Sequence, residues 1–270
     1  GQGGNDILVG VGDNAFVFGR GYGQDIVRMG MQTYAHTGLD QVLFGADIAP
    51  DDLLLENHVN DLVVKVNGST DQLTVESFFI SPSNKVDQFV FADGTVWDSN
   101  DIERQARIFV GSDADDSFYG TDGDNIIRGL GGNDQLRASL GDDTLDGGAG
   151  NDFLEGYWGN DIYLFGRGYG QDYIDDQGDS SDVDTLQLIE GIIPADVTLR
   201  ATPDFGTDAI LTINNTGDQL TLGGFFAFQS LRVDLIKFAD GTIWDYDAML
   251  AHTEGVNLVG MEEADYLYGN

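Results

Sequence analysis

Six consecutive nine-residue units occupy residues 111–164, and their period constrains the fold more than any other feature of the sequence. The units read, in order, GSDADDSFY, GTDGDNIIR, GLGGNDQLR, ASLGDDTLD, GGAGNDFLE and GYWGNDIYL. Positions 1 and 4 are glycine in five units each, position 6 is aspartate in five, and position 8 is apolar in all six. A nine-residue period does not keep one helix face apolar over 54 residues. It fits one tight turn followed by one short strand in each unit.

The repeated residue types suggest a role for each position. Glycine permits turn conformations that a Cβ opposes, and position 8 is expected to point inward and stack on its neighbours. The aspartate at position 6 is then expected on the outside of every turn, in register along the stack. Rows of carboxylates at strand spacing repel one another unless a cation lies between them. A hard, oxygen-binding cation such as calcium suits that position.

The units resemble the RTX calcium-binding repeat, G-G-x-G-x-D-x-U-x, in which U is apolar. The resemblance implies a parallel β-roll with two units per turn, in which each loop faces the loop two units further along and a calcium ion lies between them. It implies ligands from the carbonyls of positions 1 and 3 of one loop, positions 2 and 4 of the other, and both position-6 side chains. One column of loops begins at Gly111, Gly129 and Gly147, and the other at Gly120, Ala138 and Gly156. These columns imply at least four inter-loop calcium sites within 111–164.

Carried onto this chain, the resemblance implies a set of metal ligands that lie mostly in 111–164, with one residue near each end of the chain. The set comprises Gly111, Asp113, Asp116, Gly120, Gly123, Asn125, Gly129, Gly131, Gly132, Asp134, Leu140, Gly141, Asp143, Gly147, Gly148, Ala149, Gly150, Asp152, Gly159, Asp161, Asp6 and Asp265. Asn125 offers an amide oxygen in place of a carboxylate, so the Asn125–Asp143 site is expected to be the weakest. The alternative, a flexible acidic linker, does not keep an apolar residue at every ninth position.

Charge and composition agree with this interpretation. The chain has 12 basic and 47 acidic residues, a formal net charge of −35. Such a chain repels nucleic acid and anionic membranes, and without a counterion it is expected to be expanded by self-repulsion. Halophilic adaptation also produces acidity, but it scatters acids instead of placing them at fixed repeat positions. The absence of cysteine excludes disulfides and thiolate chemistry, and no stretch approaches 18 apolar residues.

A larger repeat flanks the nonapeptides. FGRGYGQD occurs at 18–25 and 165–172, and FADGTVWD at 91–98 returns as FADGTIWD at 238–245, both at an offset of 147. This module resembles the haemolysin-type calcium-binding-protein-related domain. The predicted organisation is the end of a repeat block at 1–18, module copy 1 at 19–106, the roll at 107–164, copy 2 at 165–253, and the start of another block at 254–270. Gly1–Val9 and Gly260–Tyr268 fit the nonapeptide, and Gly10–Phe18 fits it with Ala15 at position 6, so the chain is expected to be part of a longer protein.

The predicted fold class is all-β, with a parallel β-roll alternating with mostly antiparallel, β-rich capping modules that carry one short helix each. Residues 15–18 and 25–28 are expected to be edge turns that continue the roll. Short strands are expected at 40–44, 51–56, 61–67, 71–76 and 86–91, with a helix over 99–106 capped by Ser99 or Asn100. An open stack of strands leaves backbone groups unpaired, and a β-rich module at the end of the roll meets that need.

Signals of catalysis are weak. The three histidines, His36, His58 and His252, do not recur between the copies, and neither HExxH nor Gly-x-Ser-x-Gly occurs. We therefore expect no catalytic residues. Trp97 and Trp244 follow equivalent turns, where an indole is more often a core anchor than a sugar-binding surface. Arg20 and Arg167 are expected to pair with Asp25 and Asp172 or with a carbonyl.

Two functional hypotheses follow. The resemblance implies a calcium-binding, non-catalytic folding and spacer segment of a large bacterial protein, a toxin, adhesin or exoenzyme, exported to the extracellular space by a type I secretion apparatus. The alternative is a carbohydrate-binding accessory module of an extracellular polysaccharide-acting enzyme, with cell-surface glycans as partners.

Overall fold

The computed structural model describes residues 3–29, 38–80, 82–189, 191–202, 207–227 and 232–254. It divides into two compact units, Gly1–Val110 and Gly111–Asn270, each of which is described by itself. Within the described residues, no helix is long and apolar enough to cross a membrane.

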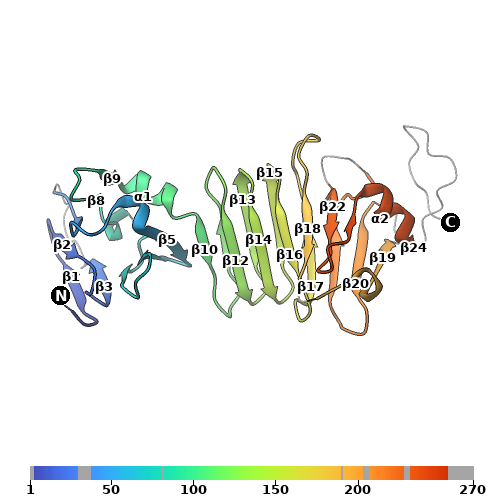
Figure 1. Ribbon diagram of the computed structural model, residues 1–270, viewed down its shortest axis with the longest axis horizontal. Coiled ribbons are helices and arrows are strands. Elements are labelled where there is room, and N and C mark those ends of the chain that lie inside the picture. Colours follow the sequence, from blue (N-terminus) through green and yellow to red (C-terminus); the bar gives the residue numbers. More distant parts are fainter. Residues whose placement is uncertain are drawn as a thin grey trace. The chain divides into compact units, whose positions relative to one another are not determined.

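The nonapeptides of unit 2 form two columns of parallel strands, in agreement with the predicted roll (Figure 1). In both columns the paired residues are 18 apart, as Leu136 opposite Leu154 and Leu145 opposite Tyr163 show. Two units therefore make one turn. One column contains β11 (Ser117–Tyr119), β13 (Gln135–Leu140) and β15 (Phe153–Trp158), and the other contains β12 (Ile126–Gly131), β14 (Thr144–Ala149) and β16 (Ile162–Phe165).

Position 8 of every unit points into the core, as the sequence predicts. Five of these six side chains are at most 1% exposed, and Phe118, in the first unit, is 5% exposed. Burial of one such side chain contributes about 1.5–3 kcal/mol, so a six-residue stack is a substantial part of the stability of the roll. The six residues are Phe118, Ile127, Leu136, Leu145, Leu154 and Tyr163.

The two columns continue into the second module. After β15 come β17 (Gln171–Ile174) and β21 (Gln219–Leu222), and after β16 come β18 (Thr185–Leu188) and β22 (Leu235–Lys237), all in parallel. Each column then ends in antiparallel strands. The remaining elements are η3 (Pro194–Asp196), β19 (Val197–Ala201), β20 (Ala209–Ile213), β23 (Ile243–Trp244), α2 (Tyr246–His252) and β24 (Thr253–Glu254).

Unit 1 repeats this arrangement. Parallel columns β1–β3–β7 and β2–β4–β8 are followed by the antiparallel strands β6–β5 and β9, and β10 pairs in parallel with β5. The bounds are β1 (Ile7–Gly10), β2 (Ala15–Phe18), β3 (Gln24–Met29), β4 (Gln41–Phe44), η1 (Pro50–Asp52), β5 (Leu53–His58), β6 (Asp61–Val66), β7 (Gln72–Val75), η2 (Pro82–Asn84), β8 (Gln88–Val90), β9 (Val96–Asp98), α1 (Ser99–Gln105) and β10 (Ile108–Val110).

Three details differ from the sequence-based expectation. Antiparallel pairing is confined to the ends of the columns, so each module has a mixed sheet. Helix α1 is capped by Asp98, whose Oδ1 accepts the N–H of Asp101 at 2.9 Å, because the carboxylate one residue earlier reaches the third helical N–H. In the unit that follows β1, Asn14 and not Ala15 takes the position-6 place: its N–H donates to Asp40, and Ala15 is exposed.

Candidate calcium sites in the loops of the roll

The position-6 side chains form a hydrogen-bonded ladder along each column of unit 2. In the first column, the N–H of Asp116 donates to Oδ1 of Asp134 and the N–H of Asp134 donates to Oδ1 of Asp152, both at 2.8 Å. In the second, the N–H of Asn125 donates to Asp143 at 2.6 Å and that of Asp143 to Asp161 at 2.8 Å. One oxygen of each accepting carboxylate is therefore used to hold neighbouring loops in register.

The other oxygen of these carboxylates is buried without a hydrogen-bond donor. Oδ2 of Asp134, Asp143, Asp152 and Asp161 has no partner, and all four residues are at most 2% exposed. A buried anionic oxygen without a partner is costly in free energy unless a cation accompanies it. The donor set, made of carboxylate oxygens and loop carbonyls, is the one calcium prefers, so the residues fit the ion.

This burial corrects the expectation that position 6 lies on the outside of the turn. Consecutive side chains point in opposite directions, and it is position 5 that faces solvent. The exposed row is hydrogen-bonded in its own right: Asp142 donates its N–H to Asp124 at 3.1 Å and accepts the N–H of Asn160 at 2.8 Å. The position-6 ladder is thus internal, and the exposed row beside it consists of aspartate and asparagine residues.

Without a cation, the fold disfavours the charged form of the ladder carboxylates. Burial raises the pKa of Asp134 and Asp143, and it raises the pKa of Asp152 to about 6. Burial, with neighbouring carboxylates, raises the pKa of Asp161 and of Asp172 to about 8. A bound divalent cation reverses this preference, because an opposite charge nearby favours the carboxylate.

Close stacking of the loops explains the glycines. Gly150 has φ +153° and a Cβ added there would overlap the carbonyl oxygen of Gly132 in the next loop. At position 1, a Cβ on Gly129 would overlap Oδ2 of Asp134, which curls back over its own loop. Glycine is therefore needed for turn geometry, for the close approach of neighbouring loops, and to leave room for the unpaired Oδ2 atom.

The carbonyls expected as ligands line the same loops. At position 3, the carbonyl of Ala149 accepts the N–H of Gly132 at 3.1 Å, and the carbonyl of Leu140 accepts the N–H of Gly123. Each carbonyl has a second lone pair, so these bonds leave it able to contact an ion. Asp113, also at position 3, is exposed.

At the Asn125–Asp143 step of the second column, the side chain of Asn125 supplies a hydrogen-bond donor where other units have a carboxylate. Its Nδ2 donates to the carbonyls of Thr121 (2.7 Å) and Gly123 and to Oδ1 of Asp143 (2.9 Å). The amide thus occupies the place between carbonyls and carboxylate where a cation is expected elsewhere. In unit 1, Asn14 does the same toward Gly12 and Asp40.

Replacing Asn125 by aspartate is expected to strengthen calcium binding at the site between residues 125 and 143. The Asn125→Asp change removes the competing donor and supplies a carboxylate, so the protein should bind one more calcium ion at subsaturating calcium. Equilibrium dialysis at matched free calcium measures the difference. Asp124→Asn, one residue away on the exposed row, is the matched control, and an unchanged ion count in Asn125→Asp would show that the amide does not exclude the ion.

The ladder continues past the nonapeptides, which the sequence analysis did not predict. The N–H of Asp152 donates to Oδ1 of Asp172 at 2.9 Å, and the N–H of Asp161 donates to Oδ1 of Asp184 at 2.8 Å. The spacings are 20 and 23 residues, so the nine-residue period hides them. The signal that remains is an aspartate two residues before a buried apolar residue, as in Asp172 before Ile174.

Two aspartates of the second module are satisfied by the protein itself. Asp218 accepts the N–H groups of Gly168 at 2.9 Å and Gly170 at 3.0 Å, and although burial raises its pKa, these bonds outweigh it and hold the pKa below its usual value. Asp234 forms an ion pair with Arg232 at 3.3 Å. The second ladder therefore ends at Asp234, which an arginine compensates, whereas the first ends at Asp172, which lies opposite Leu220 of β21.

The remaining predicted residues fall in different places. In unit 1, the N–H of Asp6 donates to Oδ1 of Asp25 at 3.0 Å, and Oδ2 of Asp25 is buried without a partner. Arg20 bonds the carbonyls of Asp47 and Asn67 and does not pair with Asp25. Asp265 and His36 lie outside the described residues.

Acidification should stabilise the calcium-free protein. Asp152, Asp161 and Asp172 have folded-state pKa values of about 6, 8 and 8, above the ordinary 3.8, so folding takes up protons between these values. Stability without calcium should then rise as pH falls from 8 toward 4. Circular dichroism in chelator at pH 8, 6 and 5 measures this as a gain of β structure. With saturating calcium the trend should reverse, because protons compete for the ligands; a calcium-free protein that weakens from pH 8 to pH 5 would contradict the assignment.

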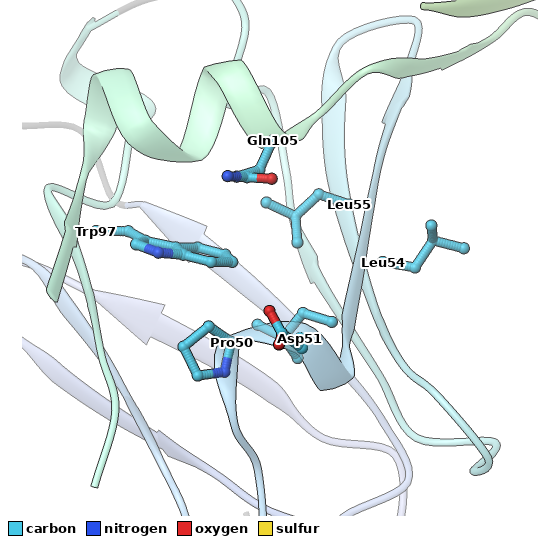
Figure 2. A pocket seen from close by; sticks show the side chains of 7 residues that line it. Pro50, Asp51, Leu54, Leu55, Trp97 and Gln105 are labelled. Carbon is cyan, nitrogen blue, oxygen red and sulfur yellow. The ribbon is translucent and has the colours of Figure 1, made fainter. Parts of the chain in front are cut away.

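The two tryptophans are placed differently. Trp244 is 6% exposed and its indole stacks on the His252 ring, with centroids 4.2 Å apart. Trp97 is partly exposed and lines a pocket of about 330 Å³ with Pro50, Leu55 and Gln105 (Figure 2). The other described histidine, His58, contacts Glu56 at 2.6 Å.

Two family models match the chain. The RTX calcium-binding nonapeptide repeat matches residues 110–145 and 137–172, and the haemolysin-type calcium binding protein related domain matches residues 61–101 and 208–248. The chain belongs to the RTX-type calcium-binding repeat proteins. Its cofactor is Ca²⁺, and the number of repeats fits several ions per chain.

Solved structures resemble parts of this RTX-type protein. The solution structure of the AlgE6R3 subunit from the Azotobacter vinelandii mannuronan C5-epimerase is 28% identical, with coverage of 57% of this chain and 91% of that one and a TM-score of 0.37. The crystal structure of the extracellular lipase LipA from Serratia marcescens is 17% identical, with coverage of 88% and 40% and a TM-score of 0.35. No curated protein sequence matches the chain.

Proposed function

We propose that this chain is a calcium-dependent folding and spacer segment of a larger protein that leaves the bacterial cell by type I secretion, with no catalytic role of its own. The observation that carries the proposal is the ladder of buried carboxylates whose second oxygens have no protein donor. Such a ladder couples the folded state to calcium, because the ion satisfies groups that the chain leaves unpaired.

The coupling suits export through a narrow channel. At low calcium, the net charge of −35 and the uncompensated carboxylates oppose collapse, which keeps the chain extended. Where calcium is abundant, binding at several levels stabilises the folded state by mass action. The chain is then folded outside the cell and unfolded inside it.

The polar groups of unit 2 support a structural role. The ladder aspartates hold loops in register, and the exposed position-5 row is hydrogen-bonded to itself. His58 contacts Glu56 and His252 stacks on Trp244, and neither of these contacts is with a hydroxyl or thiol nucleophile. We propose on this basis that any catalysis belongs to other parts of a longer protein.

Export of this chain joined to a type I secretion signal tests the proposal. Protease added to cell lysates prepared in chelator should degrade the intracellular chain, whereas the secreted chain in millimolar calcium should resist digestion. Removal of calcium from the medium should make the secreted chain sensitive again. A protease-resistant chain inside the cell, or resistance outside that does not depend on calcium, would refute the role.

A carbohydrate-binding role has one observation in its favour. The pocket beside Trp97 presents part of an indole together with the polar side chains of Asp51 and Gln105 (Figure 2), a combination suited to a sugar ring. In the second copy, His252 takes the place of Gln105 and covers Trp244. Titration with oligosaccharides should perturb the fluorescence of the wild type and not of Trp97→Phe. An identical response in both would exclude the pocket.

A further inference from the structure

Three buried carboxylates meet where the last nonapeptide joins the second module. Asp161 precedes β16, Asp176 follows β17 and Asp184 precedes β18, so the three come from separate segments. One oxygen of each lies within 4.8 Å of the others, and the three residues are 0%, 1% and 3% exposed, respectively. Asp176 belongs to no ladder and was not expected from the sequence.

The protein leaves this cluster electrically uncompensated. Oδ2 of Asp161 and Oδ2 of Asp176 are both buried without a hydrogen-bond partner, and none of the ion pairs among the described residues includes any of the three. The Tyr163 hydroxyl accepts the N–H of Gly156 at 2.8 Å and donates to Oδ1 of Asp176 at 3.0 Å, which fixes that side chain and leaves its other oxygen unpaired. Burial and the facing Asp184 raise the pKa of Asp176.

The first module shows what the same position looks like without a cluster. Its ladder bond from Asn14 to Asp40 matches that from Asp161 to Asp184. The repeat FGRGYGQD places Met29 where the second copy has Asp176. The Nδ2 of Asn14 donates to Asp40 at 2.7 Å, and Met29 packs against the hydrophobic core of unit 1. One carboxylate with a side-chain amide donor thus stands where the second copy has three carboxylates, of which Asp161 and Asp176 each keep an unpaired oxygen.

We propose that Asp161, Asp176 and Asp184 together bind one hard divalent cation, calcium under extracellular conditions, in a site that the first module lacks. The site deepens the proposed function, on which it rests, because it ties the last turn of the roll to the segments that enter and leave the 175–184 loop. An amide or an apolar side chain at any of these three positions would remove a negative charge that binds the ion, as Asn14 and Met29 do in the first module.

Counting bound ions in the full chain tests the site. Asp176→Asn keeps the size of the side chain and removes one carboxylate, and it should lower the calcium bound at saturation by one ion per chain. Asp175→Asn is the matched control, because it makes the same charge change one residue away at a partly exposed side chain that accepts a bond from Gln177. It should leave the count unchanged. Native mass spectrometry with equilibrium dialysis provides the count.

A second readout separates loss of an ion from loss of the fold. When the pH is lowered from 8 in chelator, Asp176→Asn should regain β structure by circular dichroism at a higher pH than the wild type, because one of three mutually repelling carboxylates is gone. Equal calcium counts in Asp176→Asn and the wild type would overturn the site and indicate that the cluster is held by a shared proton, while the roll still binds its other ions. If neither protein binds calcium, the proposed function itself fails.

Discussion

At neutral pH in the presence of a chelator, the roll at 107–164 is expected to be largely disordered, and millimolar calcium is expected to fold it cooperatively. Without the ion, the ladder aspartates, such as Asp134 and Asp152, each bury an unpaired carboxylate oxygen, and several of them are stacked in each column. The free energy supplied by ion binding is then free energy of folding. Circular dichroism across a calcium titration measures the gain of β structure.

Magnesium is the control for this experiment. Calcium accepts six to eight oxygen ligands in flexible geometry, whereas magnesium requires a small octahedron and retains its waters, so it should not reproduce the transition. A β signal of equal size in chelator, or an equal response to magnesium, would contradict the account.

Asp134→Ala should have one of the largest effects of any single loop substitution in the first column. Asp134 accepts the N–H of Asp116 and donates its own N–H to Asp152, so it faces a loop on each side. The substitution removes a buried charged acceptor and a ligand from two adjacent levels. We expect the calcium midpoint for folding to rise at least about tenfold, equivalent to about 1.4 kcal/mol.

Asp122→Ala is the matched control for that change. Asp122 is an exposed residue of the same block, and its side chain accepts only a long bond from Ser139 at 3.3 Å. Its removal should alter stability by no more than about 0.5 kcal/mol, as at ordinary surface positions. Calcium titrations of both variants by circular dichroism make the comparison, and coincident midpoints would show that position 6 does not carry the ions.

The period of nine with an apolar eighth residue predicts one turn and one short strand in each unit. The resemblance to the RTX repeat implies two units per turn, and the pairing of Leu136 with Leu154 at an offset of 18 agrees with it. The burial of position 6 was harder to predict, because a carboxylate is normally a surface group and only the stacked loops enclose it. Aspartates occur at both position 5 and position 6, as Asp142 and Asp143 show, so the sequence alone does not tell which of the two is buried.

Features outside the strict period could not be read from the sequence. Asp172 and Asp184 continue the ladders at spacings of 20 and 23, because the intervening loops belong to the module. Asn14 takes the ladder position in a unit that is one residue short, so counting by nine selected Ala15. Asp176 contacts Tyr163 and lies beside Asp161 only through folding, and no sequence spacing connects these residues.

The location of the calcium ions tests the central claim most directly. Anomalous diffraction from calcium-loaded crystals should place ions beside the buried Oδ2 atoms of Asp134, Asp152 and Asp161, with a weaker or absent peak at the Asn125 level. Ions bound instead along the exposed row of Asp124 and Asp142, with none at the buried oxygens, would contradict the account.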